Sequence, residues 1–204
     1  MTSRIIAVRH GQSEGNVARI WTSAVDGYPL TGLGREQARA VGERMAGEGV
    51  EHVYSSPFPR ARQTAEEIGA VLGLVPALAE GLEEFDVGHH EGEHDDTVGP
   101  LAIEVFTRWW RDDDLTAGFT GGETGHQIVD RVRRAFDTLA DRHAGSTTLV
   151  VSHGGSLAVG LNALCENLDS LFVSQHILAN CDVVDLVRED DTWRCTTWAG
   201  VPVS

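Results

Sequence analysis

Two segments of the sequence share one pattern, and each contains a histidine that could take part in catalysis. Residues 6–13 read IAVRHGQS and residues 149–156 read LVVSHGGS: an apolar strand-like run, a polar residue, histidine, glycine, any residue and serine. Either histidine alone is compatible with an ordinary turn residue, but the repetition favours a shared site. Because ligands bind at the carboxyl ends of strands in open α/β sheets, we expect His10 and His153 to meet there if the two strands are neighbours.

Two arginines could bind an anion near these histidines. Arg9 adjoins His10, and Arg60 falls in the first turn of a helix that Ser56 is predicted to cap and Pro57 to begin. The N-terminus of a helix presents unpaired N–H groups and the positive end of the helix dipole, which favour an anion. Two guanidinium groups and a helix N-terminus together predict a phosphate site.

The elements that must position these residues alternate along the chain. Apolar runs predict strands at residues 5–8, 53–55, 147–152, 181–187 and 193–198, the last two antiparallel. Helical periodicity occurs in residues 38–45, 61–72, 98–110, 124–139 and 157–164, with a capping box from Thr124 to Gln127. This alternation predicts an α/β protein, a three-layer α/β/α sandwich with a mostly parallel central sheet. Residues 87–122 interrupt it and are predicted to form a cap insertion within a single domain spanning residues 1–204.

Five short motifs carry a family resemblance that extends over residues 4 to about 160. They lie at residues 9–11 (RHG), 55–65 (SSPFPRARQTA), 82–88 (LEEFDVG), 121–123 (GGE) and 152–155 (SHGG). In this order they resemble the histidine phosphatase superfamily, which contains the cofactor-dependent phosphoglycerate mutases. The motif RHG alone has little specificity, whereas five motifs in order are specific.

The resemblance implies a catalytic role for five residues. His10 corresponds to the nucleophile, which must be neutral to attack phosphorus and form a phosphohistidine. Arg9, Arg60 and a protonated His153 would surround the phosphoryl oxygens. Glu84 takes the position that donates a proton to the leaving alkoxide and then activates water.

The resemblance also implies further substrate contacts. Asn16 and Thr22 match family positions that touch the phosphate, and Ser13 is a candidate hydroxyl partner. Glu83 adjoins Glu84 and is the alternative proton donor. Residues 112–114 are three consecutive aspartates in the predicted cap, and they predict a preference for a small monoester with a neutral or cationic remainder.

Composition excludes several classes of protein. The 204 residues carry a formal net charge of -15, which disfavours binding to nucleic acid or to anionic membranes. No apolar run approaches the length of a membrane span, and no signal peptide is recognisable. Three cysteines without paired spacing suggest neither a disulfide framework nor a zinc site, which favours a cytoplasmic location.

A histidine-rich segment is the one candidate for a metal site. His89, His90, His94, Asp95 and Asp96 have suitable side chains, but their spacing matches no closed four-ligand site. The resemblance implies turnover without a metal, so we expect neither a metal nor another cofactor.

Three functions are compatible with these residues. The first is a phosphomonoesterase acting on a small phosphorylated metabolite. The second is a cofactor-dependent phosphoglycerate mutase, against which the short segment between Glu84 and Glu123 argues, together with the sequence Phe85-Asp86-Val87 where the mutase pattern has Arg, His and Tyr. The third is a non-catalytic phosphate-binding module. The oligomeric state stays open, and a homodimer is one alternative.

Overall fold

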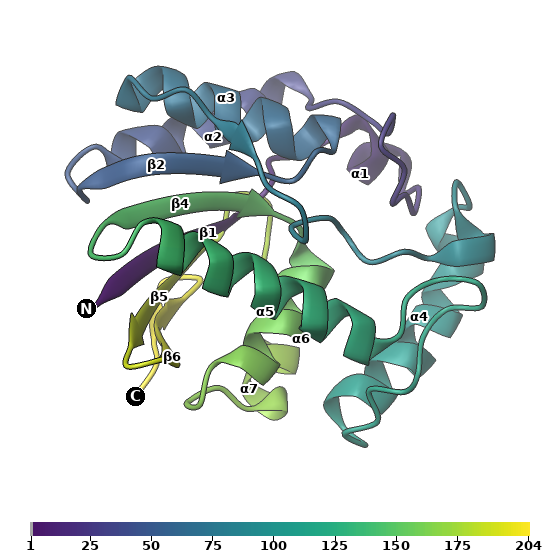
Figure 1. Ribbon diagram of the computed structural model, residues 1–204. Helices are drawn as coiled ribbons and strands as arrows, with labels where there is room; N and C mark the ends of the chain where they lie inside the picture. Colours follow the sequence, from purple (N-terminus) through teal and green to yellow (C-terminus); the bar gives the residue numbers. More distant parts are fainter. Residues whose placement is uncertain (1) are drawn as a thin grey trace.

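The central element of the protein is a mixed sheet with helices on both faces (Figure 1). The computed structural model describes residues 2–204, within which the sheet has seven strands. The strands are β1 (Ser3–Arg9), β2 (Val50–Ser55), β3 (Ala77–Leu78), β4 (Thr147–Ser152), β5 (Val183–Glu189), β6 (Thr192–Trp198) and β7 (Val201–Pro202). The order in the sheet is β3-β2-β4-β1-β5-β6-β7.

The sheet has a parallel and an antiparallel part. Strands β3, β2, β4 and β1 pair in parallel. From β1 to β7 every pairing is antiparallel, including the predicted pair of β5 and β6. The predicted α/β sandwich is therefore confirmed, and its parallel part contains both strands that end in a catalytic candidate.

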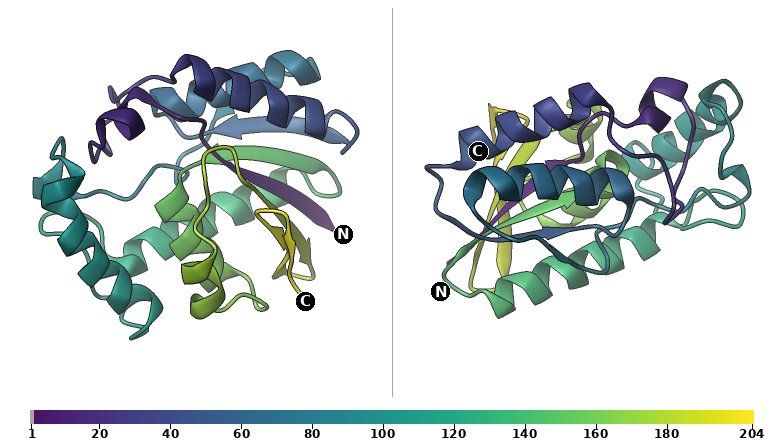
Figure 2. Two further views of the ribbon diagram at one scale, coloured as in Figure 1. Left: turned by 180° about the vertical axis from the view of Figure 1, so that it is seen from behind. Right: turned by 90° about the horizontal axis from the view of Figure 1, so that it is seen from above.

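The two helical layers bury alternate side chains of the same strands. Helices α2 (Gly32–Met45) and α3 (Pro59–Leu72) lie side by side over one face (Figure 2). Helices α5 (Gly125–Arg142) and α6 (Gly154–Leu164) cover the other. In β1, Ile6 and Val8 belong to the core under α2 and α3, whereas Ile5 and Ala7 belong to the core under α5 and α6. A strand segment buried on both faces is apolar throughout, as residues 5–8 of β1 are.

One predicted helix start is right and another is wrong. Helix α5 begins after Thr124 with the predicted capping box to Gln127. Helix α3 begins at Pro59 with Phe58 as its N-cap residue, rather than at Pro57 after Ser56. Both prolines satisfy the preference for the first helical position, and the Ser56 hydroxyl has a different partner in the site described below.

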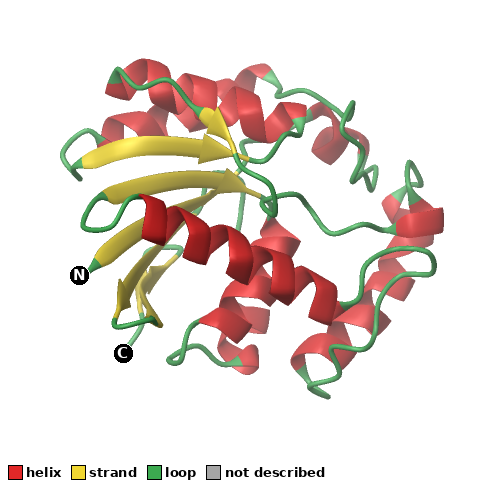
Figure 3. Ribbon diagram, viewed as in Figure 1, coloured by secondary structure: helices red, strands yellow, loops and turns green. Residues whose placement is uncertain are grey.

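The segment 87–122 stands at the carboxyl ends of the parallel strands (Figure 3). It contains a short 3₁₀ helix, η1 (Gly88–His90), and α4 (Asp95–Trp110). Two short helices that the sequence analysis does not predict, α1 (Glu14–Ala18) and α7 (Ser170–Gln175), complete the structure. Within residues 2–204, every helix is too short or too polar to span a membrane.

Candidate active site

The two histidines of the repeated pattern meet at the carboxyl edge of the sheet. Strands β1 and β4 are parallel neighbours with Arg9 opposite Ser152 in the register, so both chains leave the sheet at the same level. The ring centroids of His10 and His153 lie 5.1 Å apart. The predicted proximity of these two residues is confirmed.

The glycine after His10 is needed for a close approach between two backbones. Gly11 does not have a positive φ, so its backbone conformation does not explain why this residue is glycine. A Cβ atom at Gly11 would lie 2.5 Å from the carbonyl oxygen of Gly34 in α2. The Gly11 N–H donates to the Thr64 hydroxyl at 3.0 Å, which links the His10 turn to α3.

His10 is buried as a neutral ring with a defined tautomer. Its Nδ1 lies 2.8 Å from the carbonyl oxygen of Gly11, which can only accept, so Nδ1 carries the proton. Its Nε2 accepts a hydrogen bond from Arg60 Nε at 3.2 Å. Burial, together with the positive charges of Arg60 and Arg9, lowers the pKa of His10 well below 6.5. The lone pair of His10 is therefore on Nε2, the atom that could attack phosphorus.

The two arginines bring positive charge into a nearly dry environment. Arg60 is 4% exposed, and its Nη2 donates to the carbonyl oxygen of Thr22 at 3.0 Å. Arg9 donates through Nη1 to the carbonyl oxygen of Leu178. Among residues 2–204, Arg9 Nε and Arg60 Nη1 have no hydrogen-bond partner although both atoms are buried. Because an unpaired buried donor is costly, an oxyanion bound between these groups would satisfy them.

His153 differs in protonation from the expectation based on the sequence. Its Nε2 lies 2.8 Å from the hydroxyl oxygen of Ser56, which itself accepts from the N–H of Phe58. Within residues 2–204, the Ser56 hydroxyl hydrogen has no acceptor other than His153 Nε2, which places the ring proton on Nδ1. Burial and the charge of Arg60 lower the pKa of His153 well below 6.5. The lowered pKa and the hydrogen bond to Ser56 favour a neutral ring in the absence of substrate, and the protonated His153 expected around a bound phosphoryl group stays a prediction.

The backbone at the start of α6 distinguishes Glu84 from Glu83. Glu84 Oε1 accepts from the N–H groups of Ser156 at 2.8 Å and Phe85 at 3.1 Å, and Oε2 accepts from Gly155 N–H at 3.2 Å. Glu84 lines the same pocket as His10. Glu83 lines a different hollow, and its carboxylate accepts from the N–H of Gly81. Glu84 is thus the carboxylate that can reach a substrate at His10.

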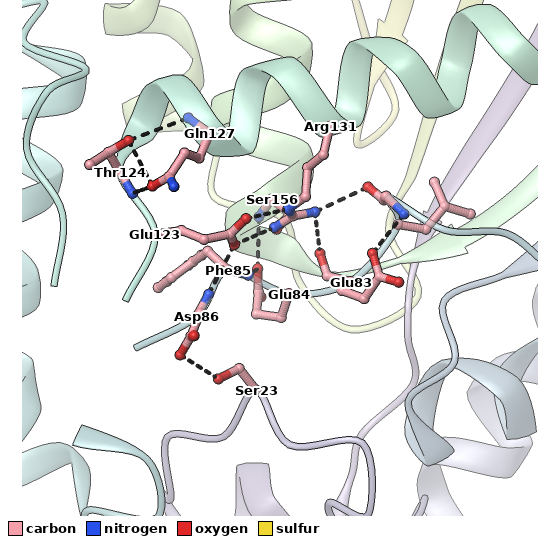
Figure 4. Close-up of polar contacts among 12 residues, drawn as sticks. Ser23, Glu83, Glu84, Phe85, Asp86, Glu123, Thr124, Gln127, Arg131 and Ser156 are labelled. Carbon is pink, nitrogen blue, oxygen red and sulfur yellow. Dashed lines mark hydrogen bonds and ion pairs between the residues drawn. The ribbon is translucent and has the colours of Figure 1, made fainter. Parts of the chain in front are cut away.

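Arg131 anchors the loop that carries Glu84 (Figure 4). Its guanidinium donates to both carboxylate oxygens of Glu123, at 2.8 and 3.0 Å, and to the hydroxyl of Ser156 at 2.9 Å. It also donates to the carbonyl oxygens of Gly81 and Glu83. Arg131 therefore connects α5, the start of α6 and the Glu84 loop, a role that its place on an amphipathic helix did not reveal.

The predicted secondary contacts all line the pocket. Ser13 and Asn16 form a capping box at the start of α1, and Thr22 follows on the next loop. Asn180, which sequence reasoning missed, donates to the carbonyl oxygen of His10 at 3.0 Å and to Asn16 Oδ1 at 3.2 Å. Its loop reaches the site only because β5 pairs with β1, and no sequence motif marks it.

The outer part of the pocket is apolar, and the pocket volume is about 420 Å³. Trp110 lines it while Trp109 is 1% exposed in the core, because consecutive residues of a helix point in directions about 100° apart. Residues 112–114 are not among the described residues that line the pocket. These aspartates therefore make no direct contact with the pocket, and the expectation that they repel anionic substrates stays a prediction.

The histidine-rich segment has structural partners. His90 Nδ1 lies 2.9 Å from Glu93 Oε2, and His94 Nδ1 accepts from the N–H of Asp96 at the start of α4. In the described part of the chain, no three histidine, cysteine or acidic side chains are arranged so that they could hold a metal ion.

Comparison with known proteins places the chain in a family. The family model of the histidine phosphatase superfamily (branch 1) matches residues 5–200. The chain belongs to the histidine phosphatase superfamily. Phosphoglycerate mutase-like protein 4 of Arabidopsis thaliana is 34% identical, and the match covers 98% of this chain and 86% of that protein. The probable phosphoglycerate mutase GpmB of Citrobacter koseri is 30% identical, with 96% and 89% covered.

Solved structures of this superfamily share the fold. A mycobacterial glucosyl-3-phosphoglycerate phosphatase, solved in complex with VO3, superposes with a TM-score of 0.82 at 26% identity over 96% of this chain and 98% of that one. The YhfR protein of Bacillus stearothermophilus also gives a TM-score of 0.82, at 26% identity, with 98% and 97% covered. The family resemblance predicted from five motifs is confirmed over almost the whole chain.

Proposed function

We propose that this protein is a phosphomonoesterase that hydrolyses a small phosphorylated substrate through a phosphohistidine on His10. One observation carries the proposal: a neutral His10 with its lone pair on Nε2 lies beside two buried guanidinium groups, in a pocket that also contains the Glu84 carboxylate. A nucleophile, fixed positive charge and a proton donor are what phosphoryl transfer needs.

In the first step, His10 Nε2 attacks phosphorus and the bond from phosphorus to the leaving oxygen breaks. For this step Glu84 has to be protonated, and it gives that proton to the leaving oxygen, so the product leaves as a neutral alcohol and Glu84 becomes a carboxylate. Arg9, Arg60 and the Nδ1–H of His153 hold the phosphoryl oxygens. The Gly11 carbonyl, which accepts from His10 Nδ1, stabilises the positive charge that the phosphorylated ring acquires.

In the second step, water attacks the phosphohistidine. The Glu84 carboxylate takes a proton from this water, the bond between phosphorus and Nε2 breaks, and phosphate leaves with His10 restored to its neutral form. The segment 87–122, which supplies Val87, Asp95, Phe106 and Trp110 to the pocket, acts in this proposal as a cap over the reacting groups.

Substitution of the nucleophile His10 tests the proposed mechanism. We expect His10→Ala to abolish release of phosphate from p-nitrophenyl phosphate, and rapid quenching of the wild type to trap acid-labile, base-stable phosphate on the chain. His126→Ala, at an exposed position at the start of α5, is the matched control and should retain full activity. Near wild-type hydrolysis by His10→Ala would refute the proposal. EDTA should leave the rate unchanged.

A mutase is the second candidate, because two relatives carry phosphoglycerate mutase names. Incubation with 3-phosphoglycerate and a bisphosphate primer separates the two functions. Release of inorganic phosphate without 2-phosphoglycerate supports the phosphatase, and formation of 2-phosphoglycerate supports the mutase.

A further inference from the structure

The walls of the pocket beyond the phosphate site are built from aromatic and aliphatic side chains. Helix α4 contributes Phe106 and Trp110, whose ring centroids lie 4.9 Å apart. The ring centroids of Trp21 and Phe106, which both line the pocket, lie 6.3 Å apart. Val173 of α7 and Ile177, which is 66% exposed at the mouth, extend the apolar surface.

The charged groups of this outer region offer no attraction for a second anion. Among the described residues, the charged side chains that line the pocket are Arg9, Arg60, Glu84, Arg19 and Asp95. The first three belong to the reaction centre. Arg19 is held between Asp95 at 2.7 Å and Asp96 at 2.9 Å, so this corner carries a net negative charge. A carboxylate on the substrate would find repulsion there.

The size of the pocket indicates that more than a phosphate group binds. A volume of about 420 Å³ falls within the range of about 300–1,000 Å³ that is typical of small-molecule sites. Aromatic walls bind planar apolar groups through stacked or edge-to-face contacts in addition to the burial of apolar surface.

Building on the proposed function, we propose that the substrate is a monophosphate ester of an alcohol with an uncharged aromatic ring, which binds among Trp21, Phe106 and Trp110. This class differs from the phosphoglycerates in the names of several relatives, because those compounds carry a carboxylate. The phosphate binds at Arg9 and Arg60, and the ring provides the specificity.

Three primary alkyl phosphates test this class with leaving alcohols of comparable basicity: ethyl, 2-phenylethyl and 2-carboxyethyl phosphate. The wild-type kcat/KM for the 2-phenylethyl ester should exceed that for the ethyl ester by about 100-fold, because one buried methylene alone changes specificity about 10- to 200-fold. The 2-carboxyethyl ester should be no better than the ethyl ester.

Variants on α4 locate the preference. Phe106→Ala should lower the ratio of 2-phenylethyl to ethyl kcat/KM at least tenfold. Ile103→Ala changes a side chain on the same helix that is 69% exposed and does not line the pocket, so it should keep the wild-type ratio. Should Phe106→Ala fail to fold, competitive inhibition of the wild type by 2-phenylethylphosphonate against ethylphosphonate measures the same preference.

The outcomes separate the two proposals. Hydrolysis of the ethyl ester without preference for the 2-phenylethyl ester, or a preference for the carboxylate ester, overturns the aromatic class and leaves the phosphatase intact. Hydrolysis of p-nitrophenyl phosphate but of none of the three esters also overturns the aromatic class and leaves the phosphatase intact, whereas no hydrolysis of any of the four compounds above the His10→Ala background overturns both.

Discussion

Arg131 does not line the pocket of His10, but it holds the loop that carries Glu84. We therefore predict that Arg131 controls proton transfer by Glu84. Arg131 contributes five hydrogen bonds, to Glu123, Ser156 and the carbonyl oxygens of Gly81 and Glu83. These bonds hold the loop before Glu84 against the start of α6, whose N–H groups bind the Glu84 carboxylate. We expect Arg131→Met to release this loop without changing any group that contacts phosphate.

The size of the effect follows from the burial of the ion pair. The side chains of Arg131 and Glu123 are 13% and 22% exposed, so this ion pair is partly buried. Loss of one partner costs about 3–5 kcal/mol in a fully buried pair, whereas an exposed pair contributes about 0–1 kcal/mol. We therefore expect the free energy of unfolding to fall by about 2 kcal/mol in Arg131→Met. Since a positioned general acid contributes about 10²–10⁴-fold, turnover of an alkyl phosphate should fall about 100-fold.

Dependence on the leaving group distinguishes mispositioning from general damage. p-Nitrophenolate leaves without protonation, so kcat/KM for p-nitrophenyl phosphate, which reports formation of the phosphohistidine alone, should fall much less than kcat/KM for ethyl phosphate in both Arg131→Met and Glu84→Gln. The double variant should be no slower on ethyl phosphate than Glu84→Gln, because both changes remove one function. Arg134→Met alters an exposed arginine of the same helix and should behave as the wild type.

Two results would refute this reasoning. One is an equal loss on both substrates in Arg131→Met, which would indicate a damaged phosphate site. The other is additivity in the double variant, which would mean that Arg131 acts independently of Glu84. Urea denaturation of each variant confirms that the chains compared are folded.

Two further predictions follow from the site. Burial and the nearby arginines hold the pKa of His10 well below 6.5, so the ring stays neutral as the pH falls to 6.5. We therefore expect kcat/KM, corrected for the ionisation of the substrate, to stay level through pH 6.5. A drop in kcat/KM centred at pH 6.5 would contradict the buried environment of His10. A Cβ atom at Gly155 would lie 2.1 Å from Phe85 Cε1 and 3.1 Å from Glu84 Oε1, so Gly155→Ala should reduce kcat for ethyl phosphate at least tenfold. Gly47→Ala, where a Cβ atom meets nothing within 4 Å, is its control, and equal activity of the two variants would disprove the close packing.

The sequence was sufficient to place the two histidines in one site. Both follow a buried, apolar strand, and parallel strands end at the same edge, so neighbouring strands bring such residues together. Local signals also predicted the capping box of α5, because helix caps depend on nearby residues alone.

Other features required contacts between distant segments. Ser56 and Pro57 satisfy the local rules for a helix start, yet the Ser56 hydroxyl binds His153 and α3 starts at Pro59. The choice between Glu83 and Glu84 depends on which carboxylate meets the N–H groups of α6, which lie 71 and 72 residues after Glu84 in the chain.

What the sequence by itself determined is the set of reacting groups and the strands that carry them, since these depend on residue type and short-range periodicity. Only the tertiary structure decided the state and surroundings of those groups. The neutral rings of His10 and His153 result from burial among charges contributed by separate elements, and the aromatic wall forms where α4 packs against the Trp21 loop. Desolvation and packing depend on what surrounds a residue in space, which no local pattern specifies.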